Sequence, residues 1–187
     1  MIYTIKAGAS GSGCFSPLLV NTRNVCFKFM IDSDFIKSNR DIVRGYDRLF
    51  GVSMASVTPG CELLITPVNG SIGVKFRVRH GLNYQSAIDK RICNVNPDTV
   101  HYLRIEHSFN ERLQSWGFRL SLIPGDIESL HYHTFYAGWA PPLMMLRAPA
   151  IYGKYRFEHN IDFDIEKIPE LEFIKQEFER MEIMTRS

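Results

Sequence analysis

Three carboxylates near the carboxyl end of the chain have the type and spacing to do chemistry. Asp162, Asp164 and Glu166 alternate with apolar residues, which is typical of a strand with one acidic and one apolar face. Two carboxyl groups ~5–5.5 Å apart can cleave a glycosidic bond with retention, and same-face neighbours on a strand can provide that separation. The alternative is the solvated face of a sheet, which we favour.

Histidines and aromatic residues form two further candidate sites. His131 and His133 share a strand face, but no third ligand follows with a spacing of its own, and zinc needs at least three protein ligands. We therefore expect no metal and no other cofactor. Aromatic residues crowd the last third of the chain, where they could stack on sugar rings or pack in the core. The candidate glycan-binding residues are Tyr136, Trp139, Tyr152 and Tyr155.

Strand patterns dominate the elements that must position these residues. The clearest are Val25–Ile31, Ile72–Arg79 and Trp116–Leu122, and weaker ones are Ile2–Ile5, Glu62–Thr66, Val100–His107, His131–Tyr136 and Leu143–Arg147. Many short alternating strands indicate an antiparallel sandwich or barrel, and clean alternation speaks against parallel sheets. The apolar sides should form one core, with Phe27, Phe29, Phe76, Val78, Trp116, Phe118, Leu120, Ile161, Phe163 and Ile165.

Two segments have helical spacing. Asp41–Phe50 carries apolar residues on one side and is followed by Gly51, a favoured position for a helix C-terminal cap. The second helix begins at Pro169, and its apolar stripe suits a partner helix or a shallow groove. The predicted interface residues are Leu171, Phe173, Ile174, Phe178 and Met181. The alternative is that this helix folds back over its own sandwich.

Composition and charge restrict the class of protein. A chain of 187 residues fits one domain, and the formal charge of +2 comes without a basic run or stripe, which argues against nucleic acid as a partner. No apolar stretch reaches the ~18 residues of a membrane span. The first residues lack the features of a secretory signal, so a cytoplasmic protein is expected. The four cysteines are far apart in the sequence, which favours free thiols.

Several motifs resemble a known family. Tyr3-Thr4-Ile5-Lys6-Ala7-Gly8, Leu49-Phe50-Gly51-Val52-Ser53, and Ala148–Gly153 through His159-Asn160-Ile161 resemble lectin-like, concanavalin-type jelly-roll proteins of gut bacteria and their phages. Lys154 and Asn160 depart from the closing motif of that family, which has Gly and Asp there. The acidic strand also resembles the Glu-x-Asp-x-Glu strand of laminarinase-type glucanases, whose first and last carboxylates act as nucleophile and acid/base.

The resemblance implies an all-β, two-sheet antiparallel jelly-roll sandwich over residues 1–168, with one short inserted helix. The amphipathic C-terminal helix over 169–187 lies beyond the resemblance and is predicted from its own spacing. The resemblance also implies a non-enzymatic phage virion component, such as a head fibre, decoration or tail fibre subunit. Its partners would be itself, as a homo-oligomer, other virion or surface proteins and a host glycan. It would be located in the virion after assembly in the bacterial cytoplasm. The alternative is a carbohydrate-binding or glycan-cleaving bacterial protein of glucanase-like fold, with Asp162, Asp164 and Glu166 as its catalytic residues.

Overall fold

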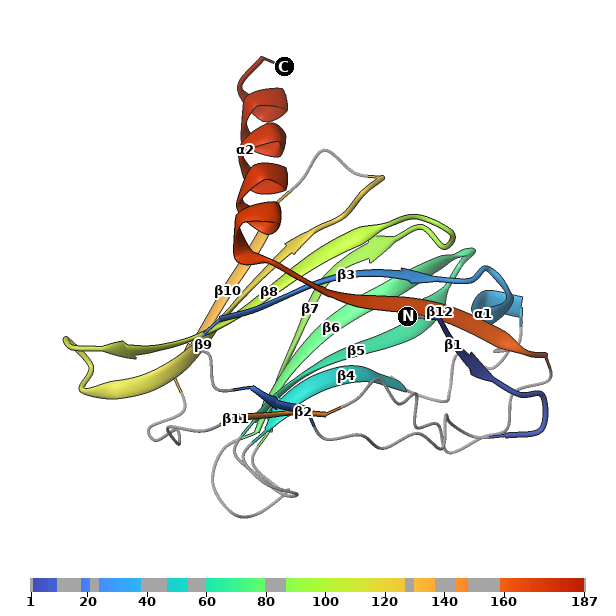
Figure 1. The fold of residues 1–187 in the computed structure, drawn as a ribbon, viewed down its shortest axis with the longest axis horizontal. Coiled ribbons are helices and arrows are strands. Elements are labelled where there is room, and N and C mark those ends of the chain that lie inside the picture. Colours follow the sequence, from blue (N-terminus) through green and yellow to red (C-terminus); the bar gives the residue numbers. More distant parts are fainter. Residues whose placement is uncertain are drawn as a thin grey trace.

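Two six-stranded antiparallel sheets lie face to face in the computed structural model (Figure 1). It describes residues 2–9, 18–20, 24–37, 47–53, 60–79, 87–126, 130–136, 144–147 and 159–186. The strands of sheet A, in spatial order, are β1 (Ile2–Ile5), β12 (Ile161–Ile168), β3 (Asn24–Ile31), β8 (His101–Asn110), β9 (Ser115–Ile123) and β10 (His131–Tyr136). Those of sheet B are β2 (Leu18–Val20), β11 (Met144–Arg147), β4 (Asp47–Ser53), β5 (Gly60–Val68), β6 (Ser71–Arg79) and β7 (Ala87–Val95).

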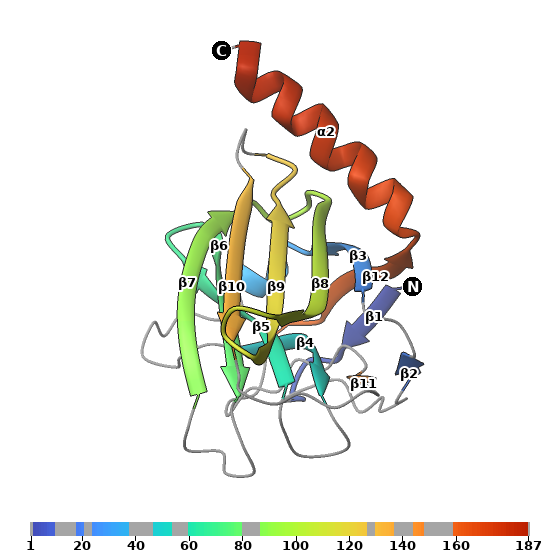
Figure 2. The same ribbon diagram turned by 90° about the vertical axis from the view of Figure 1, so that its left-hand side faces the viewer.

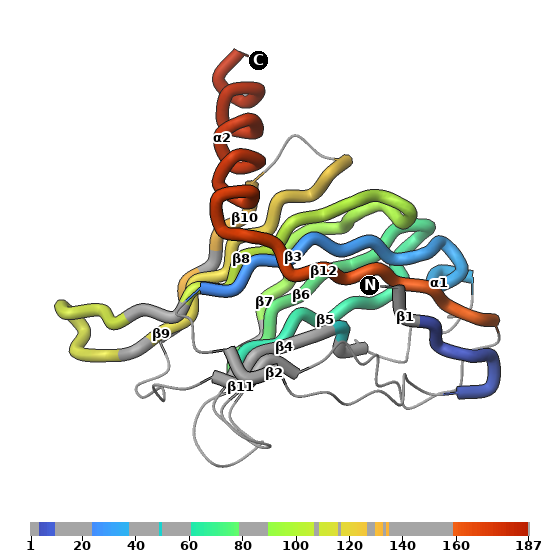
Figure 3. The backbone as a smooth tube through the Cα atoms, viewed as in Figure 1, coloured from blue at the N-terminus to red at the C-terminus, as the bar shows by residue number. Residues whose placement is uncertain are grey.

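Each sheet combines strands from distant parts of the chain. In sheet A the late strand β12 pairs with both β1 and β3, so the two ends of the sandwich sequence lie side by side (Figure 3). The tight hairpin between β5 and β6 turns at Asn69 and Gly70, both with positive φ, as a two-residue Asn-Gly turn requires. The predicted all-β jelly-roll sandwich with two helices is confirmed.

The core lies between the two sheets, on the apolar sides of the alternating strands. Nine of the ten predicted core residues are buried there, and the side chain of Trp116 lies outside the described ones. The nine are Phe27, Phe29, Phe76, Val78, Phe118, Leu120, Ile161, Phe163 and Ile165. The alternation therefore predicted the strand registers of both sheets, because a slip of one residue would have exposed these side chains.

The inserted helix does not lie where the sequence placed it. Asp47–Phe50 belong to β4, while residues 41–46 lie outside the described part of the chain. A β-bulge between Arg48 and Phe50 interrupts the alternation in this strand, so the period of two that predicts a strand is not seen there. The short helix is α1 (Asp34–Lys37), where the carboxylate of Asp32 accepts the backbone N–H of Asp34 at 2.8 Å.

The second helix, α2 (Glu170–Arg186), begins directly after β12, as predicted. Its first turns lie against the outer face of sheet A, and its carboxyl half extends away from the sandwich (Figures 1 and 2). Neither helix in the described part of the chain is long and apolar enough to cross a membrane.

Candidate functional site

The outer face of sheet B carries alternating charged side chains. Leu63 and Ile65 of β5 point into the core. Glu62 and Leu64, which alternate with them along the strand, therefore point the other way. Val74, Phe76 and Val78 of β6 lie in the core, so Lys75 and Arg77, which alternate with them, point outward. We call five outward residues on neighbouring strands the sheet B patch: Glu62, Leu64, Lys75, Arg77 and Arg91.

The strand register places the members of the sheet B patch next to one another. Arg77 lies opposite Glu62, and Lys75 lies opposite Leu64 on β5 and Arg91 on β7. Side chains directly opposite on antiparallel strands have Cβ atoms about 4.5–5.5 Å apart. Three cations are therefore brought onto one surface with the carboxylate of Glu62, and Asp89 of β7 is a second acidic residue in register with Arg77.

Two residues of the sheet B patch are buried although they lie on the face turned away from the core. Glu62 is 7% exposed and Leu64 is 1% exposed, whereas Lys75 and Arg77 are half-buried. Arg91 is exposed, and its guanidinium donates a hydrogen bond to the side-chain oxygen of Asn94 at 3.0 Å. A buried carboxylate is costly without an opposite charge or hydrogen-bond donors, and Arg77 lies opposite it. Lys75, Arg77 and Arg91 are thus the accessible charged members of the sheet B patch, whereas Glu62 and Leu64 are covered.

The outer face of sheet A is occupied by the amino-terminal half of α2. Phe173 is fully buried in a small apolar cluster with Cys26, Ile123 and Ile168, which come from three strands. The guanidinium of Arg104 lies over its ring, 5.1 Å from the centroid. The helix therefore covers the outer side of β3, β8 and β9, and an extended ligand cannot lie across them.

Polar contacts fix α2 in this position. Tyr132 donates a hydrogen bond from its hydroxyl to Glu177 at 2.6 Å, and burial together with this bond raises the pKa of Tyr132 to about 12. Arg104 lies 3.6 Å from the same carboxylate and 3.9 Å from that of Glu170. Arg180 donates to the backbone oxygen of Pro124 at 2.9 Å. The helix is joined in this way to two strands, β8 and β10, and to the loop after β9.

The three carboxylates of β12 lie on the outer face of sheet A, on one side of the strand as predicted. Asp162 accepts the hydroxyl of Thr4 at 2.6 Å. Glu166 lies 2.9 Å from the ammonium of Lys28, and this hydrogen bond raises the pKa of Lys28. Asp164 is half-buried between them. Asp162 and Glu166 thus each bind a side chain of a neighbouring strand, and their catalytic role remains a hypothesis.

The predicted aromatic platform lies outside the described side chains. Trp139, Tyr152 and Tyr155 fall in segments outside the described residues, and of Tyr136 only the backbone, at the end of β10, is described. His131 is half-buried, and burial lowers its pKa, while the side chain of His133 is outside the described set. Among the described residues no group of three or more His, Cys, Asp or Glu could hold a metal ion.

Of the four cysteines, the three described ones are Cys26, Cys61 and Cys93, and all are free thiols. Burial raises the pKa of Cys26 and of Cys93 to about 12. Since the thiolate is the nucleophilic form, neither is suited to attack a substrate at neutral pH.

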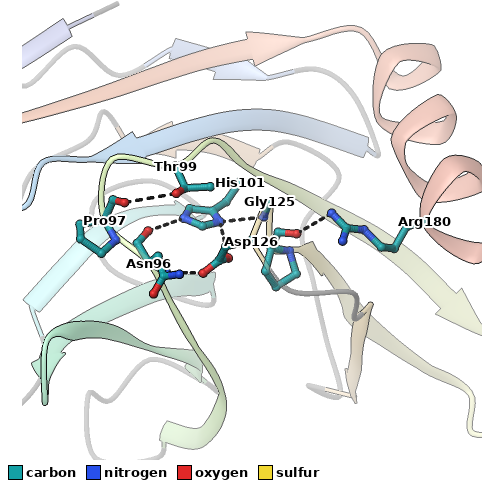
Figure 4. A network of polar contacts seen from close by, with 8 residues as sticks. Asn96, Pro97, Thr99, His101, Gly125, Asp126 and Arg180 are labelled. Atoms are coloured by element: carbon teal, nitrogen blue, oxygen red, sulfur yellow. Dashed lines mark hydrogen bonds and ion pairs between the residues drawn. The ribbon is translucent and has the colours of Figure 1, made fainter. Parts of the chain in front are cut away.

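A buried histidine connects two loops at one edge of the core (Figure 4). The Nε2 of His101 lies 3.0 Å from the backbone oxygen of Asn96, and its Nδ1 accepts the backbone N–H of Gly125 at 3.1 Å. The carboxylate of Asp126 accepts the N–H of Asn96 at 2.7 Å. A Cβ at Gly125 would collide with the backbone oxygen of Val100, so only glycine fits there. With both ring nitrogens engaged and the side chain buried, this cluster fixes loops and has no access to substrate.

Sequence analysis missed the sheet B patch as a site. It found no basic stripe because Lys75, Arg77 and Arg91 are separated along the chain, and only the pairing of β6 with β7 brings them together. It also did not predict β7, in which charged residues at 89–91 interrupt the alternation near a bulge. One feature of the sequence could have indicated the site, because Glu62 is a charged residue in the largely apolar strand β5 of sheet B.

Comparison with known proteins gives only distant likenesses. No protein-family model and no curated protein matches the chain. An alginate lyase from Klebsiella pneumoniae has 10% identity and a TM-score of 0.49, over 79% of this chain and 60% of that one. A bifunctional GH43-CE protein from Bacteroides eggerthii has 12% identity and a TM-score of 0.47, over 89% of this chain and 21% of that one. An alginate lyase from Pseudomonas aeruginosa has 10% identity and a TM-score of 0.47, over 78% of this chain and 64% of that one.

These likenesses correct part of the sequence analysis. The chain spans 64% or less of the length of each of these proteins, and the identities and TM-scores are too low to carry an activity over to it. The expectation of a non-enzymatic protein is not retained, because the solved structures with a likeness to this chain include two alginate lyases. The two-sheet sandwich agrees with the jelly-roll resemblance, whereas no comparison supports the virion interpretation.

Proposed function

We propose that this protein is glycan-active, binding or cleaving a polysaccharide, and that the ligand lies on the outer face of sheet B. The observation that carries the proposal is the juxtaposition of three cationic side chains, Lys75, Arg77 and Arg91, on neighbouring strands of this face. Ligand surfaces present a small number of polar groups in fixed positions, and the strand register fixes these three. The outer face of sheet A is less suitable, because α2 lies on it.

The charges of the sheet B patch favour an acidic polysaccharide as the ligand. A guanidinium presents a planar fork of donors that matches a carboxylate, and hydrogen bonds between charged groups are stronger than neutral ones. Arg77 and Arg91 lie on adjacent strands with Lys75 between them in the register, so successive uronate carboxylates could be held along this line. Glu62 lies opposite Arg77 and orients its guanidinium.

Glu62 is also the residue of this face best suited to proton transfer, if the bound chain is cleaved. Acid–base catalysis requires a carboxyl group in a shielded position within reach of the scissile bond. Among the described side chains of the sheet B patch, Glu62 is the one carboxylate, and it is almost fully buried. Glu62→Gln removes the proton-transfer capacity at nearly constant shape, so this variant separates turnover from binding.

Titration calorimetry of purified protein with short oligosaccharides of alginate, of polygalacturonate and of neutral cellulose tests the proposal. The variant Lys75→Gln/Arg77→Gln/Arg91→Gln should lose affinity for the acidic oligosaccharides by tenfold or more. Each lost charge-assisted hydrogen bond contributes roughly 1.5–3 kcal/mol, and about 1.4 kcal/mol corresponds to a factor of ten. Turnover is followed in parallel by release of reducing ends and by ultraviolet absorbance of unsaturated ends.

The matched control removes the same number of positive charges elsewhere. Lys6, Arg112 and Lys167 are exposed and lie outside the sheet B patch, so Lys6→Gln/Arg112→Gln/Lys167→Gln should bind the acidic oligosaccharides as the wild type does. Equal losses in the two triple variants would reduce the effect to net charge and reject the site. Binding to none of the three oligosaccharides, with no turnover, would reject the function.

A further inference from the structure

The helix α2 has two parallel stripes of side chains, and its own sandwich contacts only one of them. The contacted stripe consists of Glu170, Phe173, Glu177 and Arg180, at spacings of three, four and three. Phe173 is buried against sheet A, and the three polar residues bind Asn24, Arg104, Tyr132 and Pro124. Phe173, which sequence analysis placed in a partner interface, is therefore used within the molecule.

The second stripe consists of Leu171, Ile174, Phe178 and Met181, one position further along and so about 100° around the helix. We call it the outer stripe. Leu171 is 64% exposed and Phe178 is 60% exposed, while Ile174 is half-buried. The spacing of three, four and three is that of the a and d positions of a coiled coil. Four apolar side chains in one line, two of them more than half exposed, form a seam for another helix.

The carboxyl half of α2 offers room for such a helix. Residues 181–186 are all exposed, and this part of α2 extends past the sheets, as two perpendicular views show (Figures 1 and 2). A helix of this length is marginal by itself in water, and packing of an apolar face is what normally stabilises it. Phe173 supplies that packing only for the first turns.

Charges beside the outer stripe indicate what covers it. Lys175 and Glu182 are exposed, seven residues apart, and so lie on one flank of the stripe. In an antiparallel pair of identical helices centred near Phe178, Lys175 of each copy lies beside Glu182 of the other. A two-fold interface repeats every contact, so this ion pair forms twice. In a parallel pair the flanking partner of Lys175 is Glu170 of the second copy, which Asn24 and Arg104 contact within the sandwich. Among the ion pairs of the described residues, Glu182 has only the exposed Arg186 of its own helix, at 3.5 Å.

We propose that the outer stripe is a dimer interface, occupied by the same stripe of a second copy of this chain in antiparallel orientation. The apolar seam supplies the affinity, and the pairs of Lys175 with Glu182 select the orientation, because they are attractive in this arrangement alone. The proposal rests on α2 only and is independent of the ligand surface on sheet B.

Sedimentation equilibrium of the purified chain at micromolar concentrations measures the dimer directly. Phe178→Glu should abolish the dimer, and its fold is preserved because the side chain is exposed. Lys175→Glu and Glu182→Lys should each weaken dimerisation by about tenfold, since two attractive pairs become repulsive. The double variant Lys175→Glu/Glu182→Lys should restore the wild-type dissociation constant. Glu179→Lys, with an exposed side chain off the outer stripe, is the matched control and should leave it unchanged.

Recovery of the dimer in the double variant supports the antiparallel arrangement. A wild-type chain that stays monomeric overturns the proposal, and this includes the case in which it sediments with phosphatidylglycerol vesicles through the outer stripe. A dimer that survives Phe178→Glu, or that fails to respond to both charge reversals, overturns it as well. Circular dichroism and thermal unfolding of each variant establish that the monomer is folded.

Discussion

At the scale of single residues, the hydrogen bonds of His101 decide where its proton lies. Gly125 donates its N–H to Nδ1, so Nδ1 has no proton, and Nε2 carries the proton that it donates to the backbone oxygen of Asn96. A second proton on Nδ1 would face the N–H of Gly125 and break this bond. Burial is the main cause that lowers the pKa of His101, although Asp126, 3.8 Å away, opposes the shift. The folded protein therefore holds the neutral ring.

This argument predicts that the protein loses stability in mild acid. The pKa of His101 is lower in the folded protein than its ordinary value of 6.5, so the unfolded chain binds more protons. The contribution is fully present above about pH 6.5 and is lost as the pH falls from there through the folded pKa. Urea denaturation at a series of pH values should show the free energy of unfolding of the wild type falling over this range.

The variant His101→Gln tests whether His101 causes the slope. It should be less stable at neutral pH, since it loses one of the two ring contacts, but its free energy of unfolding should change less between about pH 7 and about pH 5. His159→Gln, at an exposed position, should keep the wild-type slope. An unchanged slope in His101→Gln would assign the acid sensitivity to other groups.

At the scale of elements, alternation predicted the strands wherever the ladder is regular. β3, β6, β9 and β12 each have one buried and one outward side over their length, and all four were predicted. β4 and β7 were not, because each contains or faces a register shift that disturbs the period of two. A bulge depends on the partner strand and cannot be inferred from the residues of one strand.

The helix α2 was also predicted, but its orientation was not. Its docked stripe is defined by Asn24, Arg104, Tyr132 and Pro124, which lie in four separate segments and meet only in the folded sandwich. Apolar residues alone favoured the outer stripe, which has four of them, whereas the docked stripe has Phe173 together with three charged residues. The structure shows that one buried aromatic side chain with polar contacts on either side suffices to fix the helix.

The two stripes predict opposite effects for two phenylalanines of the same helix. Phe173→Ala should lower the free energy of unfolding by about 3–5 kcal/mol, because it leaves a cavity among Cys26, Ile123 and Ile168. Phe178→Ala should change it by less than about 0.5 kcal/mol in the monomer, because the side chain is exposed. Urea denaturation at low protein concentration measures both. Equal losses would mean that both aromatic rings pack on the sandwich.

At the scale of the whole molecule, the two proposed surfaces lie on opposite layers. The sheet B patch is on the outer face of one sheet, and α2 is attached to the outer face of the other, with the core between them. Sites that are far apart and share no contacts act independently to within a few tenths of a kcal/mol. The sequence could not predict this separation, because the assignment of each strand to a sheet arises from pairings between distant segments, such as β12 with β1 and β3.

Independence and dimerisation together predict a difference between short and long ligands. Phe178→Glu should bind a short acidic oligosaccharide with the affinity of the wild type, since the sheet B patch is intact. It should bind the parent polysaccharide at least about tenfold more weakly, because a dimer can engage one long chain at two patches and a monomer cannot. Calorimetry with the oligosaccharide and co-sedimentation with the polymer measure the two quantities. A loss for the oligosaccharide would mean that dimerisation shapes the ligand surface itself, and equal binding of the polymer would mean that the two patches of a dimer cannot reach the same chain.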